Sequence, residues 1–261
     1  MAGIFYPQEK RPLEDLVDRL ADRRKKKEKA LAAIVPHGGY VTSGAVAGEV
    51  YSRMEWPSVV VIVGPNHTGL GEPWSIMTKG TWVTPLGSLS IDEKLARSIL
   101  ENVPELKEDP LAHRYEHSIE VQLPFIQRTG KVLGFVPIVL KAGDVAAAQR
   151  IGKGLGLAIR QEKTQALLIV STDLTQYEPQ EKAKAKDRLA IEQILHLDEA
   201  GLLKTVEKHE ISMCGSFSTA MGIATAKELG ATQGTLVRYS TSGESSGDYG
   251  SVVGYAGVLL Q

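Results

Sequence analysis

The sequence predicts an α/β fold, a single domain with a mainly parallel or mixed central sheet that is covered by helices on both faces. Strand and helix patterns alternate along most of the 261 residues. Several strands, such as residues 59–63, are short, wholly apolar runs, which are typical of parallel sheets buried on both faces. No Pro/Gly/Ser-rich or strongly charged linker divides the chain, so residues 1–261 are interpreted as one domain.

The first quarter of the chain is predicted to contain two helices and two buried strands. Apolar residues at helical spacing predict a first helix over residues 12–28. The apolar run 31–35 predicts the first strand, and residues 43–54 read as the helix that follows it. Residues 59–63 predict the second strand, which is bounded by Gly and Pro.

The next stretch is expected to leave the strand–helix alternation briefly. Residues 73–85 predict a short antiparallel excursion with a turn at Lys79-Gly80. Two acidic residues open a helix over 92–101, and apolar spacing predicts another over 116–127. Pro124 is expected to kink or end that second helix, because proline lacks a backbone N–H.

The remainder of the chain returns to the alternation. Residues 132–140 predict a third buried strand, Asp144 is a suitable N-cap for the next helix, and residues 166–170 predict a fourth strand. Residues 242–250 form a turn-rich loop between the last two strands. The other expected elements are helices over 180–194, 198–207 and 214–229 and strands over 235–241 and 251–260.

Composition excludes several classes of function. The formal net charge of −1 favours neither nucleic acid nor an acidic membrane surface as a partner. No apolar stretch is long enough for a transmembrane helix, and the first residues do not follow the pattern of a signal peptide. A single cysteine rules out an intramolecular disulfide. These observations predict a cytoplasmic protein.

Two histidines stand just past the ends of buried strands. His37 follows the strand at 31–35, and His67 follows the strand at 59–63. Ligands of open α/β sheets bind beyond the carboxyl ends of the strands. Each histidine taken alone is typical of a structural loop residue, but their equivalent positions predict a shared metal or catalytic site.

A second group of titratable residues lies between His113 and Glu120. His113 and His117 are four residues apart, so they would share one face of a continuous helix. The segment does not match the zinc motif HExxH, because no glutamate follows the first histidine directly. Glu116 and His117 open the predicted helix, so the segment is either a structural cap or a wall of the site.

Carboxylates near the same edge of the sheet supply further candidates. Asp173 follows the fourth strand inside a polar cluster. Glu244 or Asp248 in the last loop would complete a set of two histidines and one acid, which suits non-haem iron(II), although the sequence alone favours a solvated acidic loop. Cys214 precedes a helix start, where a thiol can become nucleophilic, but a small buried residue is the favoured interpretation.

The motifs in order along the chain resemble the MEMO family, named for a mediator of cell motility. The resemblance covers nearly the whole chain, and the combination of motifs is specific. It rests on Met1-Ala2-Gly3-Ile4-Phe5-Tyr6-Pro7, Val35-Pro36-His37-Gly38-Gly39-Tyr40, Gly64-Pro65-Asn66-His67, Thr84-Pro85-Leu86-Gly87, His113 with residues 116–124, Ser171-Thr172-Asp173 and Val253-Gly254-Tyr255-Ala256.

The resemblance implies a fold similar to that of class III extradiol dioxygenases, with His37 and His67 as metal ligands. Animal members have a cysteine as third ligand in the last loop, where an ungapped match places Ser246. Glu244 or Asp248 would then take that role. Asp173 matches an acid that lines the family pocket. Gln176 stands where animal members have a basic histidine, so ring cleavage by that route is not expected.

These observations lead to two functional hypotheses. The first is a metal-dependent redox enzyme that uses iron or copper, in which His117 and Asp173 orient substrate or water. The second is a non-catalytic, metal-free binding or scaffold protein whose pocket takes a phosphate-bearing or peptide ligand. A metal-assisted hydrolase ranks below both. The resemblance also implies AMMECR-type and radical-SAM proteins as partners.

Overall fold

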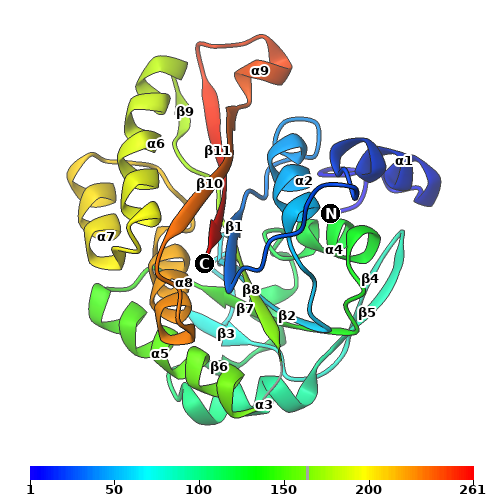
Figure 1. Cartoon of the computed structure of the whole chain (residues 1–261), viewed down its shortest axis with the longest axis vertical. Helices are drawn as coiled ribbons and strands as arrows, with labels where there is room; N and C mark the ends of the chain where they lie inside the picture. The colour runs from blue at the N-terminus through cyan, green and yellow to red at the C-terminus, as the bar shows by residue number, and fades with distance from the viewer. Residues whose placement is uncertain (163–164) are drawn as a thin grey trace.

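The computed structural model describes residues 1–162 and 165–261, and a mixed β-sheet runs through its centre (Figure 1). Most strands of the sheet are short, and the strands in its middle are completely buried. Neighbouring strands follow the order β10 (Gly234–Thr241), β11 (Val252–Leu260), β1 (Ala32–Val35), β8 (Ala166–Ser171), β2 (Val59–Pro65), β7 (Gly134–Leu140), β3 (Trp74–Ile76) and β6 (Lys107–Glu108).

The four central strands β1, β8, β2 and β7 are parallel, so their carboxyl ends meet at one edge. Antiparallel strands flank them, with β11 beside β1 and β3 beside β7. Every residue of β1, β2 and β7 is buried, as expected for strands that are covered on both faces. The mixed α/β fold predicted from the sequence is confirmed.

Helices cover the two faces of the sheet (Figure 1). One layer contains α3, α5 and α8, with α7 packed against α5 and α8, and the other contains α1, α2 and α4, while α6 packs against β10 and β11. Aspartate side chains cap α3, α5 and α7 at their N-termini. Their bounds are α1 (Lys10–Leu20), α2 (Gly44–Arg53), α3 (Glu93–Asn102), α4 (Leu123–Thr129), α5 (Val145–Gln161), α6 (Gln180–Leu195), α7 (Glu199–Lys208) and α8 (Ser216–Leu229).

The antiparallel excursion lies later in the chain than predicted. The hairpin pairs β4 (Thr81–Thr84) with β5 (Gly87–Ile91), and it turns at Pro85-Leu86. Lys79-Gly80 instead joins β4 to β3, which pairs with β7. The proposed turn at 79–80 was therefore wrong, because β3 finds its partner in the main sheet rather than in the next strand.

Two predicted helices are shorter than their patterns suggested. The first ends at Leu20, before the basic run that offers no apolar face to bury. The helix predicted over 116–127 begins only with the 3-10 turn η2 (Glu120–Gln122) and continues as α4. Pro124 opens α4 instead of ending it, since a first-turn proline sacrifices no helical hydrogen bond.

Two short elements were not predicted from the sequence. A single helical turn, α9 (Gly243–Ser246), lies in the last loop and caps the β10–β11 hairpin. A short strand, β9 (Gln176–Glu178), pairs with the start of β11. Among the helices of the described residues, none is both long and apolar enough to cross a membrane.

Candidate metal centre

Three imidazoles meet at the carboxyl edge of the parallel strands. His37 lies two residues past the end of β1, and His67 lies two residues past the end of β2. His117 comes from the segment before η2 and completes the group. The ring centroids are 5.1 Å apart for His37 and His67, 5.2 Å for His37 and His117, and 4.7 Å for His67 and His117. One potential ligand atom from each histidine lies within 4.8 Å of the other two.

The hydrogen bonds of Ser171 fix the orientation of His37, which is buried. Ser171 Oγ donates its only proton to the carbonyl of Ser118 at 2.6 Å. It must therefore accept from His37 Nδ1, which lies 3.0 Å away, and Gln122 Nε2 donates to it as well. With Nδ1 committed to this hydrogen bond, His37 turns Nε2 toward the cluster, and Nε2 can bind a metal when the ring is neutral.

One carboxylate organises the other two histidines. Glu116 is only 2% exposed, and its Oε1 lies 2.9 Å from His67 Nδ1 and 3.3 Å from His117 Nδ1. The same carboxylate accepts the backbone N–H groups of His67 and Ser118. These contacts stabilise a non-helical conformation of residues 116–119, which the sequence predicted to be helical. Because they involve Nδ1, they leave the Nε2 atoms of both imidazoles available as metal ligands. A carboxylate behind a histidine in this way is the usual support of a metal ligand.

The only cysteine of the chain lies against the histidine cluster. Cys214 Sγ is 3.3 Å from His37 Nε2, and Cys214 also raises the pKa of His67. The sequence favoured a small buried residue at Cys214 and did not predict that its thiol lies beside the histidines. The sequence signal for this close approach was the glycine that follows Cys214. A β-carbon at Gly215 would lie 2.6 Å from the side chain of Thr172. Only glycine lets this helix start approach the end of β8 so closely.

Asp173 lies two residues past the end of β8 and contacts both His37 and Cys214. Its Oδ1 accepts the backbone N–H of His37 at 2.9 Å, and its Oδ2 lies 3.9 Å from His37 Nε2. Its own backbone N–H points to Cys214 Sγ at 3.4 Å. Asp173 therefore connects β1, β8 and the start of α8, and its carboxylate borders the cluster.

The electrostatics of the site favour a charged thiolate and a protonated imidazole in the metal-free protein. Burial disfavours the thiolate of Cys214, but the charge and hydrogen bond of His37 outweigh it and lower the thiol pKa to about 6. Burial also opposes protonation of His67, yet hydrogen bonds with Cys214 and Glu116 raise the pKa of His67 to about 10. The ionisation of the Cys214 thiol is therefore coupled to the protonation of His37 and His67.

The pKa of His117 is lowered, whereas the pKa of His67 is raised. Phe5 stacks on its ring with centroids 4.5 Å apart. Burial, followed by the positive charge of His37, lowers the pKa of His117 to about 4. His117 is thus neutral at neutral pH and can accept a proton.

The structure does not bring the last loop to the histidines. Glu244, Ser246 and Asp248 are exposed, and none belongs to the group of potential metal ligands found among the described residues. They lie on and after α9, at the tip of the hairpin (Figure 1). Asp248 Oδ1 accepts the backbone N–H of Gly250, and Glu244 lies near Tyr239. The group that accompanies the histidines is instead the Cys214 thiol.

The fold and the site together define an α/β protein that gathers imidazoles and a thiol at the carboxyl edge of its parallel strands. The model of the family described as Memo-like protein matches residues 1–259, and the chain belongs to this family. It is 42% identical over 262 residues to a MEMO1 family protein of Aquifex aeolicus, covering 100% of this chain and 97% of that protein. It is 39% identical over 275 residues to the MEMO1 family protein MK0963 of Methanopyrus kandleri, with the same coverage of both chains.

The fold is also related to a solved structure of low sequence similarity. The crystal structure of uncharacterized protein JW3007 from Escherichia coli K12 superposes with a TM-score of 0.57 at 16% identity. The match covers 87% of this chain and 98% of the other. At this level of identity the likeness concerns the fold alone.

Proposed function

We propose that this Memo-like protein is a metal-dependent redox enzyme whose metal is copper or iron(II), held by His37, His67 and Cys214. The observation that carries the proposal is the approach of the Cys214 thiol to the group of imidazoles that could hold a metal ion. Cys214 Sγ lies 3.3 Å from His37 Nε2, and the potential ligand atoms of His37 and His67 lie within 4.8 Å of each other. These three groups replace the two histidines and one carboxylate expected from the sequence.

The donor set fits such a metal in type and in protonation state. Imidazole and thiolate are preferred by copper, iron and zinc and are poor ligands for calcium or magnesium. Metal binding requires a deprotonated thiol, and the pKa of Cys214 is already lowered to about 6. Both imidazoles use Nδ1 for fixed hydrogen bonds, to Ser171 and to Glu116, and so offer Nε2.

A metal bound here would supply one-electron exchange, while the surrounding residues would handle the substrate and its protons. His117 does not contact Cys214 in any described hydrogen bond, and with a pKa of about 4 it stays a neutral imidazole that can hydrogen-bond to a substrate. The Asp173 carboxylate borders the same space, 3.9 Å from His37 Nε2. We assign His117 and Asp173 the task of orienting the substrate or a water molecule.

Metal analysis of the wild-type protein, two site variants and one control variant tests the proposal. Wild-type protein, Cys214→Ser and His37→Gln are each loaded anaerobically with copper(I), iron(II) or zinc, desalted and measured for bound metal. His196→Gln serves as the matched control, because His196 is an exposed histidine outside the cluster. We expect stoichiometric metal in wild type and control and a loss of at least tenfold in affinity in both site variants.

Equal, sub-stoichiometric metal in all four proteins would refute the proposal. It would leave the non-catalytic binding pocket as the better interpretation. Stoichiometric zinc with no bound copper or iron would also contradict the redox assignment, because zinc has no redox chemistry.

A further inference from the structure

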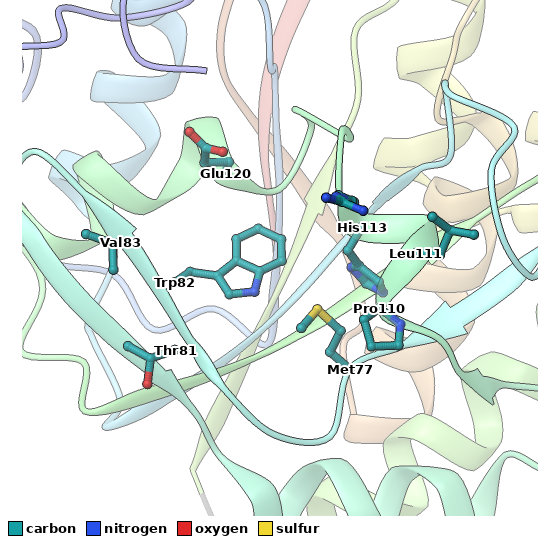
Figure 2. A pocket seen from close by; sticks show the side chains of 9 residues that line it. Met77, Thr81, Trp82, Val83, Pro110, Leu111, His113 and Glu120 are labelled. Atoms are coloured by element: carbon teal, nitrogen blue, oxygen red, sulfur yellow. The ribbon is translucent and has the colours of Figure 1, made fainter.

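A cavity of about 530 Å³ is lined in part by His113 and Glu120, which flank His117 in the sequence (Figure 2). Its walls come from β4, from the 3-10 turn η1 (Pro110–His113) and from the first residue of η2. A cavity of this size is in the range that binds small molecules. The side chains that matter for its chemistry are Met77, Trp82, Leu111, His113, Arg114 and Glu120.

One side of this cavity is apolar and aromatic. Trp82, Met77 and His113 face the same space in Figure 2. The Trp82 ring packs edge-on against His113, with centroids 6.1 Å apart, and against Phe135 at 5.4 Å. Leu111 is 47% exposed at the rim. A fixed indole between a thioether and aliphatic side chains is suited to a flat, aromatic ligand.

His113 is a buried imidazole with one unsatisfied nitrogen. The residue is only 4% exposed, and its Nδ1 has no hydrogen-bond partner among the described residues. Ser75 Oγ donates its proton to the carbonyl of Asp109 at 2.8 Å, so at 3.2 Å it accepts from His113 Nε2. Burial lowers the pKa of His113 to about 4, so the ring is neutral and Nδ1 is a bare acceptor. Nδ1 exposes less than 1 Å² in this structure, so a small turn of the ring would present it to an O–H or N–H donor of a ligand.

The rim of the cavity carries one cation without an anionic partner. The Arg114 guanidinium makes no ion pair within residues 1–162 and 165–261, and its described contact is with the ring of Tyr115, 5.5 Å from the centroid. Glu120, the acid of the lining, is already engaged. It accepts the Tyr6 hydroxyl at 2.6 Å and pairs with the N-terminal amine of Met1 at 3.1 Å. The free charge at the rim is therefore positive.

We propose that this cavity binds a small aromatic carboxylate that carries a hydroxyl or N–H donor. The ring of the ligand packs on Trp82 and Met77, its donor points to His113 Nδ1, and its carboxylate pairs with Arg114. The proposal is independent of the metal centre, because none of these three contacts involves His37, His67 or Cys214.

Three matched ligands test the proposal on the full-length protein, after treatment with a chelator. The probes are 4-hydroxyphenylacetate, phenylacetate without the hydroxyl donor, and 4-(2-hydroxyethyl)phenol without the carboxylate. Affinities come from calorimetry and from ligand-observed NMR. We expect saturable binding of 4-hydroxyphenylacetate and weakening by about threefold to tenfold for each probe that lacks one group.

Two variants assign the contacts to residues. Arg114→Met keeps the aliphatic stem and should remove the preference for the carboxylate, while His113→Phe should remove the preference for the phenol hydroxyl. His113→Asn keeps an acceptor near the position of Nδ1 and should retain part of that preference. Lys26→Met, an exposed cation outside the cavity lining, is the control and should bind all three probes as wild type does.

The result that would overturn the proposal does not depend on the folding of any variant. Equal affinity of wild-type protein for all three probes, or no saturable binding of any at millimolar concentration, would sink it. An unchanged ranking of the probes in Arg114→Met would do the same. Loss of metal binding in the metal-site variants, with probe binding intact, leaves the proposal standing.

Discussion

Replacing Glu116 by glutamine should destabilise the fold and weaken the metal site together. The Glu116 carboxylate accepts hydrogen bonds from the imidazole of His67 and from two backbone N–H groups, and it lies 3.3 Å from His117 Nδ1. A glutamine has the same shape but only one acceptor oxygen. Its amide N–H₂ group would face N–H donors of His67 or Ser118 and could not accept from them. Residues 116–119 would then lose part of the network that keeps them in position.

The pKa of Glu116 gives the size of the effect. Burial favours the protonated acid, but the hydrogen bond and charge of His67 outweigh it and lower the pKa from 4.5 to about 2. A lowered acid pKa means that the ionised carboxylate stabilises the folded state, here by about 3 kcal/mol above its ordinary pKa. This contribution is lost as the pH falls from 4.5 toward 2.

Urea unfolding of chelator-treated protein across this pH range measures the prediction. At neutral pH the free energy of unfolding of Glu116→Gln should be about 3 kcal/mol below that of wild type. The gap should close toward the acid end, because protonated glutamate and glutamine are both neutral. Copper affinity should fall by about tenfold to a hundredfold, as for other residues that orient metal ligands.

Glu199→Gln is the matched control for this experiment. Glu199 is also buried, and it pairs with Lys227 at 2.8 Å and with Gln149 at 3.0 Å, outside the histidine cluster. Its replacement should reduce stability and leave copper affinity unchanged. A stability gap for Glu116→Gln that does not depend on pH, or a copper affinity equal to wild type, would refute the reasoning.

Three further predictions concern the same site in the metal-free protein. Alkylation of Cys214, followed by mass spectrometry, should have its midpoint near the thiol pKa of about 6, and His37→Gln should move the midpoint toward 9.0; equal midpoints would count against the effect of His37 on the thiol. Phe5→Ala uncovers the ring of His117 and should raise its pKa from about 4 toward 6.5, and an unchanged NMR titration would contradict the role of burial. Gly215→Ala places a β-carbon 2.6 Å from a neighbouring side chain, so it should cost about 1–3 kcal/mol in urea unfolding and raise the alkylation midpoint; wild-type values of both would show that the approach is not tight.

Most elements of the sheet were predictable because their signals are local. The apolar runs at β1, β2, β7 and β8 are bounded by turn residues, and each formed a buried strand at nearly the expected residues. The N-cap at Asp144 was equally clear, because its side chain accepts the backbone N–H of Ala147. The hairpin β4–β5 was placed wrongly, since local turn residues do not reveal which strand pairs with the main sheet.

The sequence by itself determined that His37, His67 and Asp173 follow parallel strands, and strand polarity then brings them to one edge. Only the tertiary structure decided which further groups join them. Cys214 reaches the cluster because Gly215 permits close contact with β8, and Glu116 reaches it because its carboxylate competes successfully with helix formation. Such contacts join residues from distant parts of the chain, and no local pattern encodes them, so the sequence pointed to the last loop while the folded chain places the Cys214 thiol beside the histidines.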